Sequence, residues 1–209
     1  MLRFAVPCAL CLGLFLPLAV VAHSGFVSEQ EIALAQGIQQ ALLPTFLPLF
    51  LALNPLGKLW AVTLYGMATV AILWKTNHPR ESLILFLGLI SVQSNFLLKA
   101  IIGRPRPDES LLPSYASVST AHGFPSGDVQ LFTVFWGLLF YFAPVVFAQK
   151  WAVKGFRVWA LLMIVTVGPE RVALGVHWPT DVLGGYLIGG ATLCALLWLY
   201  AYVPLRQQP

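Results

Sequence analysis

Charged residues are scarce in this chain of 209 residues: Asp, Glu, Lys and Arg make up 10% of it, whereas hydrophobic residues make up 58%. An ordinary soluble domain carries roughly 25% charged residues. So few charges cannot cover the surface of a water-soluble protein of this size, and the apolar surplus would form large exposed patches. The composition excludes an ordinary soluble domain and predicts that lipid surrounds most of the chain.

Cysteine is also sparse, and the positive charge is thinly spread. The three cysteines, Cys8, Cys11 and Cys194, lie inside apolar runs. This placement gives no indication of a disulfide framework and is typical of small buried hydrophobic side chains. The net charge of +4 does not indicate a nucleic-acid partner, because the basic residues form no dense stripe.

Long hydrophobic runs are what the chain has in abundance. A helix needs about 20 mostly apolar residues to cross a bilayer. Six segments meet this length, at about 4–22, 56–74, 82–102, 129–147, 156–175 and 182–203. Residues 28–43 have the pattern of an amphipathic helix lying in the membrane interface, and the apolar run after them is too short and too rich in proline to span alone. The predicted fold class is an all-α, polytopic membrane helix bundle of about six transmembrane helices with a short interfacial amphipathic helix.

The first segment, residues 1–24, has two interpretations. Arg3, the apolar run and the small residues before His23 fit a cleavable signal peptide. The same run is long enough to be the first transmembrane helix. Both interpretations place residue 25 outside the cytoplasm, so residues 25–209 are predicted to form a single membrane-embedded domain with one topology.

Positive charges predict the orientation of this domain. Lys and Arg of short loops mark the cytoplasmic side, and they fall into three groups: Lys75 with Arg80, Lys150 with Lys154 and Arg157, and Arg206. Lys58 alone departs from this pattern. The two remaining connections, 103–128 and 176–181, then face the periplasm or exterior from an inner (plasma) membrane location.

Both outer connections carry ionisable residues at helix ends, where a rigid element can aim a side chain. The segment "KAIIGRPRP" contributes Lys99 and Arg106, with Arg104 between them; "PSGD" contributes Ser126, Gly127 and Asp128; and "ERVALGVHWPTD" contributes Arg171, His177 and Asp181. The cations suit a phosphate, which arginine binds through two oxygens at once. Ser126 and Gly127 open a helix whose free N–H groups favour an anion.

His177 and Asp181 are the candidate nucleophile and its orienting carboxylate. The carboxylate would hold one ring nitrogen protonated and leave the other nitrogen free to attack phosphorus. Taken alone, each part also has a structural interpretation: cations at a membrane boundary, a helix start at His177, and a packing role for the glycines from Gly184 to Gly190. Their coincidence on one predicted face favours a phosphoryl-transfer site.

These three segments resemble the motifs of the type 2 phosphatidic acid phosphatase superfamily, which comprises membrane lipid phosphatases. Its motifs are Lys-x6-Arg-Pro, Pro-Ser-Gly-His and Ser-Arg-x5-His-x3-Asp, and the likeness covers roughly residues 56–203. The resemblance implies a phosphohistidine at His177, oriented by Asp181, and no metal or other cofactor. It implies phosphate binding by the remaining motif residues, which are Lys99, Arg106, Ser126, Gly127 and Arg171.

Two positions depart from the family pattern. Glu170 stands in place of the motif's Ser, and Asp128 stands in place of its second His, which donates a proton to the leaving group. Asp128 is predicted to be a replacement acid, with His122 as a second candidate donor. A phosphate leaves more readily than an alkoxide, because its second pKa is near 6, so the change weakly favours a lipid diphosphate as substrate.

The predicted function is hydrolysis or transfer of phosphate from a lipid phosphate or diphosphate, such as a polyprenyl diphosphate, lipid A or a phospholipid head group. The site would face outward, its partners would be a phosphorylated lipid and the bilayer, and the acceptor, water or lipid, stays open. The alternative is a catalytically weak or inactive relative that binds phosphorylated head groups.

Overall fold

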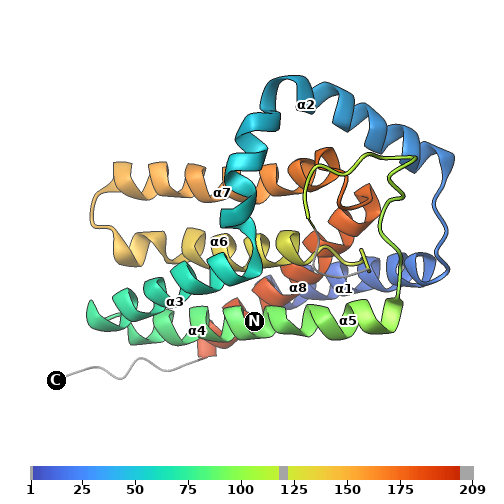
Figure 1. Ribbon diagram of the computed structural model, residues 1–209. Coiled ribbons are helices and arrows are strands. Elements are labelled where there is room, and N and C mark those ends of the chain that lie inside the picture. Colours follow the sequence, from blue (N-terminus) through green and yellow to red (C-terminus); the bar gives the residue numbers. More distant parts are fainter. Residues whose placement is uncertain (1, 118–121, 203–209) are drawn as a thin grey trace.

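The computed structural model describes residues 2–117 and 122–202, and the regular secondary structure of this part is helical. The helices are α1 (Leu2–His23), α2 (Glu29–Gly57), α3 (Leu59–Lys75), α4 (Pro79–Ser91), η1 (Val92–Ser94), α5 (Asn95–Ile102), α6 (Gly127–Val146), α7 (Lys150–Ala173) and α8 (Pro179–Tyr202). The elements α4, η1 and α5 follow one another as a single rod along the bundle (Figure 1). The expectation of an all-helical bundle is confirmed.

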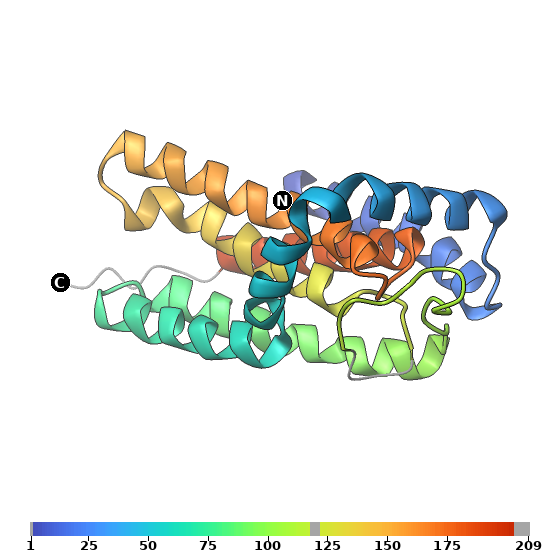
Figure 2. The ribbon, with the colours of Figure 1, turned by 45° about the horizontal axis from the view of Figure 1, so that its top comes forward.

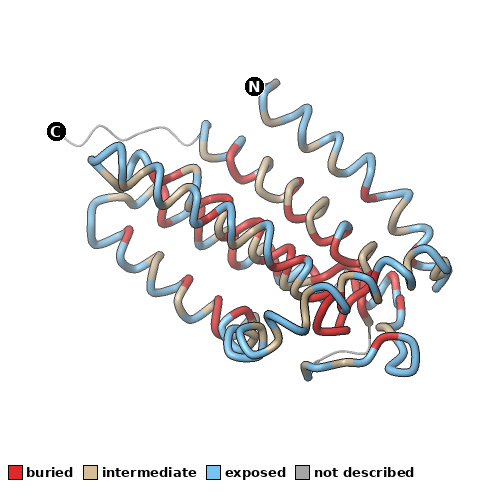
Figure 3. Tube along the Cα trace, turned by 90° about the horizontal axis from the view of Figure 1, so that it is seen from above, coloured by how far each residue is buried: buried red, intermediate tan, exposed pale blue. Residues whose placement is uncertain are grey.

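The interior of the bundle lies around α6, which packs against both α7 and α8. Its most apolar window is 56% buried, the largest share among the candidate spans. Buried residues follow the inward faces of the helices, and exposed residues cover the outer faces (Figure 3). The exposed residues include large apolar side chains such as Leu64, Leu97 and Ile101. An apolar exterior over a packed core fits a protein whose solvent is lipid.

Six of these helices are long and apolar enough to cross a membrane, which confirms the expected number of spans. They are α1, α2, the α4–α5 rod, α6, α7 and α8. One expected span differs: α3 has 17 residues, which at 1.5 Å per residue makes it about 25 Å long. It covers the segment predicted at 56–74 but is slightly short for a perpendicular crossing.

The structure extends α2 beyond its predicted amphipathic part. Ser28 caps the helix by accepting a hydrogen bond from the Glu31 N–H at 3.1 Å. The helix then continues through Pro44, Pro48 and Pro55 and turns sharply on the way (Figures 1 and 2). Proline removes a backbone hydrogen bond and clashes with the preceding turn, which bends a helix without always ending it. The proline-rich run, which was expected not to span alone, thus continues the amphipathic segment as one helix that is long and apolar enough to cross a membrane.

One end of the bundle holds the elements that carry the predicted site. The connection after α5, the start of α6 and the α7–α8 turn meet there, beside the first part of α2 (Figure 1). Gly175 in that turn has φ +72°, and a Cβ there would lie 2.1 Å from the Pro113 carbonyl oxygen. Tyr115 N–H also donates to the Leu174 carbonyl at 2.9 Å. These contacts tie the α5–α6 connection to the α7–α8 turn and so position His177.

Candidate active site

His177 lies between α7 and α8 and is 2% exposed. Its Nε2 atom is 3.3 Å from Arg106 Nη1, and its Nδ1 atom is 3.4 Å from Asp181 Oδ2. Because arginine only donates hydrogen bonds, the contact with Arg106 assigns the lone pair to Nε2 and the proton to Nδ1. The second contact is longer than an ordinary N–H···O bond.

Burial lowers the pKa of His177 from its usual 6.5 to about 4, because its surroundings disfavour the imidazolium. The contact with Asp181 opposes this shift, and the nearby charge of Arg106 adds to it. The imidazole is therefore neutral at pH 7. A neutral ring with its lone pair on Nε2 is the form that attacks phosphorus.

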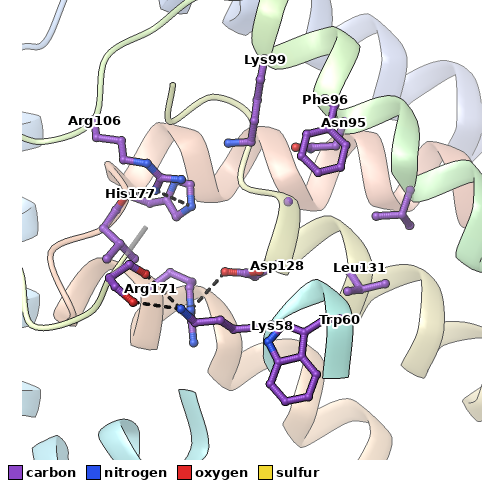
Figure 4. Close-up of a pocket in the computed structure, with 14 residues that line it drawn as sticks. Lys58, Trp60, Asn95, Phe96, Lys99, Arg106, Asp128, Leu131, Arg171 and His177 are labelled. Carbon is purple, nitrogen blue, oxygen red and sulfur yellow. Dashed lines mark hydrogen bonds and ion pairs between the residues drawn. The ribbon is translucent and has the colours of Figure 1, made fainter. Parts of the chain in front are cut away.

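Three predicted cations, Lys99, Arg106 and Arg171, line one pocket of about 310 Å³ together with His177 (Figure 4). The Lys99 ammonium donates to two backbone carbonyls of the α5–α6 connection, those of His122 and Gly123, each at 3.0 Å. Arg106 Nη1 donates to the Val176 carbonyl at 2.6 Å. The structure thus brings together three cations from two separate segments of the chain around one histidine.

The start of α6 supplies the helix N-terminus that the sequence predicts. Gly127 lines the pocket, and a Cβ at this position would lie 3.0 Å from Asn95 Oδ1, so glycine lets α6 approach α5. Ser126 is the N-cap and is completely buried; its backbone N–H donates to the Asp181 carbonyl at 2.9 Å. Its hydroxyl has no hydrogen-bond partner in the described part of the chain.

Asp128 and Glu170, the two departures from the motif pattern, both form ion pairs with Arg171. Asp128 Oδ2 is 3.1 Å from Arg171 Nη1, and Glu170 Oε1 is 2.8 Å from Arg171 Nη2. Asn54 of α2 also accepts from Nη1 at 2.9 Å. Asp128 lines the pocket, and its side chain is 27% exposed. His122, the second candidate donor, is half-buried and is not among the described residues that line this pocket.

Several residues at the site were not predicted. Lys58, the exception to the charge pattern, lines the pocket, and its ammonium donates to the Ser117 carbonyl and hydroxyl oxygens, both at 3.2 Å. Arg104 and Glu31 lie behind Asp181 and complete a buried ion-pair network with it. The charge pattern singled out Lys58, and Arg104 stands inside the first motif segment. Glu31 carries no such signal.

The described residues contain no group of three or more His, Cys, Asp or Glu side chains arranged to hold a metal ion. The charged groups of the pocket instead suit an anionic ligand.

Comparison with known proteins identifies the family. A profile of the PAP2 superfamily matches residues 81–205. The chain belongs to the PAP2 superfamily. The resemblance of the three motifs to type 2 phosphatidic acid phosphatases is therefore confirmed at the level of the family.

One curated sequence and one solved structure, both from Bacillus subtilis, are similar to this PAP2 chain. Phosphatidylglycerophosphatase B of strain 168 is 37% identical over 99 residues, which are 46% of this chain and 45% of the relative. The chain thus aligns with less than half the length of this curated relative. The crystal structure of a transmembrane PAP2 type phosphatidylglycerolphosphate phosphatase superposes with a TM-score of 0.81 over 96% of this chain and 98% of the other, at 22% identity. That likeness establishes the fold.

Proposed function

We propose that this PAP2 protein is a membrane lipid phosphatase or phosphotransferase that cleaves phosphate from a lipid phosphate or diphosphate. One observation carries the proposal: the Nε2 lone pair of neutral His177 lies in a pocket that also contains Lys99, Arg106 and Arg171. A nucleophile with clustered cations is what phosphoryl transfer needs, because the developing charge rests on the phosphoryl oxygens.

The pocket also has an apolar side that suits a lipid. Trp60 of α3, Phe96 of α5 and Leu131 of α6 line it on the side away from His177 and Arg106 (Figure 4). Trp60 and Phe96 are 64% and 50% exposed, so this side opens toward the surface that lipid covers. A lipid can place its phosphate at the cations while its chains stay in the bilayer.

The proposed reaction has two steps. His177 Nε2 attacks phosphorus, the bond to the leaving oxygen breaks, and that oxygen takes the electron pair. In the second step the oxygen of water or of an acceptor lipid attacks phosphorus, and the electron pair of the N–P bond returns to the ring. The proton of that water or hydroxyl passes to the Asp128 carboxylate, which gave its proton to the leaving group in the first step. Asp181 holds the Nδ1 proton and stabilises the positive ring of the intermediate.

Asp128 is the proposed proton donor to the leaving group. Asp128 is bound to Arg171, so a substrate phosphate must first take its place on the guanidinium. A lipid diphosphate needs this proton least. The likeness to phosphatidylglycerophosphatase B makes phosphatidylglycerophosphate a further candidate substrate.

The alternative function is binding of phosphorylated head groups without turnover. The observation in its favour is that Arg171 already carries two carboxylate partners, Asp128 and Glu170. Phosphate release separates the two functions.

The test is phosphate release by detergent-solubilised protein from a panel of lipid phosphates and diphosphates. We expect turnover, and we expect His177→Ala to lower it by on the order of 1000-fold or more, as loss of a covalent nucleophile does, with lipid binding retained. His78→Ala is the matched control, because His78 lies in the α3–α4 connection at the other end of the bundle (Figure 1). A fully active His177→Ala variant would exclude the phosphohistidine, and an inactive wild type that binds the lipids would favour the alternative function.

A further inference from the structure

Arg104 is the centre of a buried ion-pair network behind the candidate nucleophile. Its Nη1 atom is 2.7 Å from Asp181 Oδ1, and its Nη2 atom is 2.9 Å from Glu31 Oε2. The side chains of Arg104, Glu31 and Asp181 are 2%, 9% and 0% exposed. Charges so far from water are costly unless they are paired and held in good geometry, so this arrangement places strong constraints on all three side chains.

Glu31 also binds the helix that carries Asp181. Its Oε1 atom accepts from the Thr180 backbone N–H at 3.0 Å and from the Thr180 hydroxyl. Thr180 is the second residue of α8, and N–H groups in a first helical turn have no partner within their own helix. The carboxylate therefore caps α8 from α2, and its negative charge suits the positive end of the helix dipole.

Asp181 is held on both of its oxygens by this arrangement. Oδ1 accepts from Arg104, and Oδ2 accepts from the Trp178 backbone N–H at 3.0 Å while it faces His177 Nδ1. The orientation of Asp181 thus depends on Arg104, and the orientation of Arg104 depends on Glu31. The two carboxylates and one guanidinium together leave one net negative charge beside the imidazole.

We propose that Arg104 and Glu31 are positioning residues for the His177–Asp181 pair, so that the start of α2 forms part of the catalytic machinery. This inference rests on the proposed function of the site. It extends the machinery to a segment that lies outside the residues matched by the family profile, 81–205. Arg104 does not line the phosphate pocket. A positioning role explains why its guanidinium is nevertheless buried beside the site.

The expected consequence is a loss of turnover without a loss of substrate binding. Glu31→Gln keeps the size of the side chain and removes its charge, so Arg104 would be drawn fully to Asp181. The carboxylate would then orient the imidazole less well and stabilise its positive form less. We expect kcat to fall roughly 10-fold to 100-fold, the range for loss of an outer partner of a functional ligand, with KM changed less than about 2-fold because neither residue lines the pocket.

The pH profile supplies a readout that a purely structural role would not move. The charged groups that face His177 are Asp181 of α8, Arg106 of the α5–α6 connection and Lys99 of α5. Arg104 lies behind Asp181. Removing the negative charge of Glu31 disfavours the imidazolium further, so the pKa of His177 falls and the acid limb of kcat/KM moves to lower pH. Titration of the substrate is common to all variants and cancels from the comparison.

The experiment measures kcat, KM and the acid limb of the kcat/KM pH profile for four variants. The substrate is the lipid phosphate or diphosphate that the wild type turns over best. Glu29→Gln is the matched control: it makes the same change in the same helical turn, at an exposed residue, and should behave as wild type. Glu31→Asp keeps the charge and should recover part of the loss. Arg104→Lys should follow Glu31→Gln in kcat, because an ammonium cannot bind both carboxylates as a planar guanidinium does. Thermal unfolding identifies variants that fail to fold, and only the folded variants are compared with the wild type.

Wild-type kcat in folded Glu31→Gln and Arg104→Lys, or an equal loss in Glu29→Gln, would overturn the positioning role. A raised KM at constant kcat would also overturn it. An inactive wild type would instead contradict the proposed function, so the two failures are distinguishable.

Discussion

Asp128 is the residue whose proposed role has the clearest test, because a proton donor would affect release of poor leaving groups more than release of good ones. Its carboxylate lies in the pocket and is bound to Arg171 at 3.1 Å. Donation of a proton requires that substrate phosphate replace it on Arg171. A donor role and a purely electrostatic role therefore predict different responses to the leaving group.

We predict that Asp128→Asn lowers turnover by about 10²-fold to 10⁴-fold for lipid phosphates that release an alkoxide, which is the usual contribution of a general acid. The loss should be far smaller for lipid diphosphates and for activated aryl phosphates, because their leaving groups need little protonation. Asp128→His should restore a donor and move the basic limb of the profile toward neutral pH. Phosphate release across pH measures all three responses.

Glu170→Gln is the control for this prediction, since it removes the other carboxylate from Arg171 and should show no dependence on the leaving group. If Asp128→Asn raises affinity and leaves the rate unchanged for every substrate, Asp128 acts only on the charge of the pocket.

The α7–α8 turn is the element that places His177, and one glycine makes this turn possible. Gly175 adopts a left-handed conformation, with φ +72°, and packs directly against the backbone at Pro113. A side chain in this conformation costs about 1–2 kcal/mol, and a Cβ 2.1 Å from the Pro113 oxygen would also force the α5–α6 connection away.

We predict that Gly175→Ala lowers the midpoint of thermal unfolding in detergent and lowers phosphate release, because it separates the two connections that hold the site. Gly155→Ala is the matched control: Gly155 lies inside α7, and apart from the adjacent backbone of α7 no described atom lies within 4 Å of a Cβ built there. Alanine in a helix interior is favoured over glycine by about 1 kcal/mol. An unchanged midpoint and rate for Gly175→Ala would show that the turn adapts freely.

At the scale of the whole molecule, the candidate site occupies one end of the bundle and the basic loops between α3 and α4 and between α6 and α7 occupy the other (Figure 1). Lys and Arg in short loops mark the cytoplasmic side. The site end is accordingly proposed to face the periplasm or exterior.

Cysteine labelling tests this orientation in a variant whose three native cysteines are replaced. We predict that Leu111→Cys, at an exposed position of the α5–α6 connection, reacts with a membrane-impermeant thiol reagent added to intact cells. Gln149→Cys, exposed between α6 and α7, should react only after the membrane is permeabilised. The reverse pattern, or equal labelling of both, would contradict the outward-facing site.

Most of the bundle was predictable because the length and hydrophobicity of a span are local properties. The apolar runs gave helices close to the expected bounds, for example α6 at Gly127–Val146 against 129–147. The position of the motif residues was predictable for the same reason. Spans of alternating direction bring the end of α5, the start of α6 and the α7–α8 turn to one membrane face. Lys99, Arg171 and His177 meet in one pocket for this reason.

The pairing of charges across that face depends on packing between distant segments, which no local pattern encodes. Glu31 reaches Thr180 across 149 positions of the chain, and only the course of α2 over the start of α8 brings them together. The same holds for Asp128, whose ion pair with Arg171 follows from the contact of α6 with α7. The sequence thus specified which elements would meet at the membrane face, because hydrophobic length and helix geometry act locally. The tertiary structure selected the partner of each charge, because a buried ion pair forms only where packing aligns both side chains.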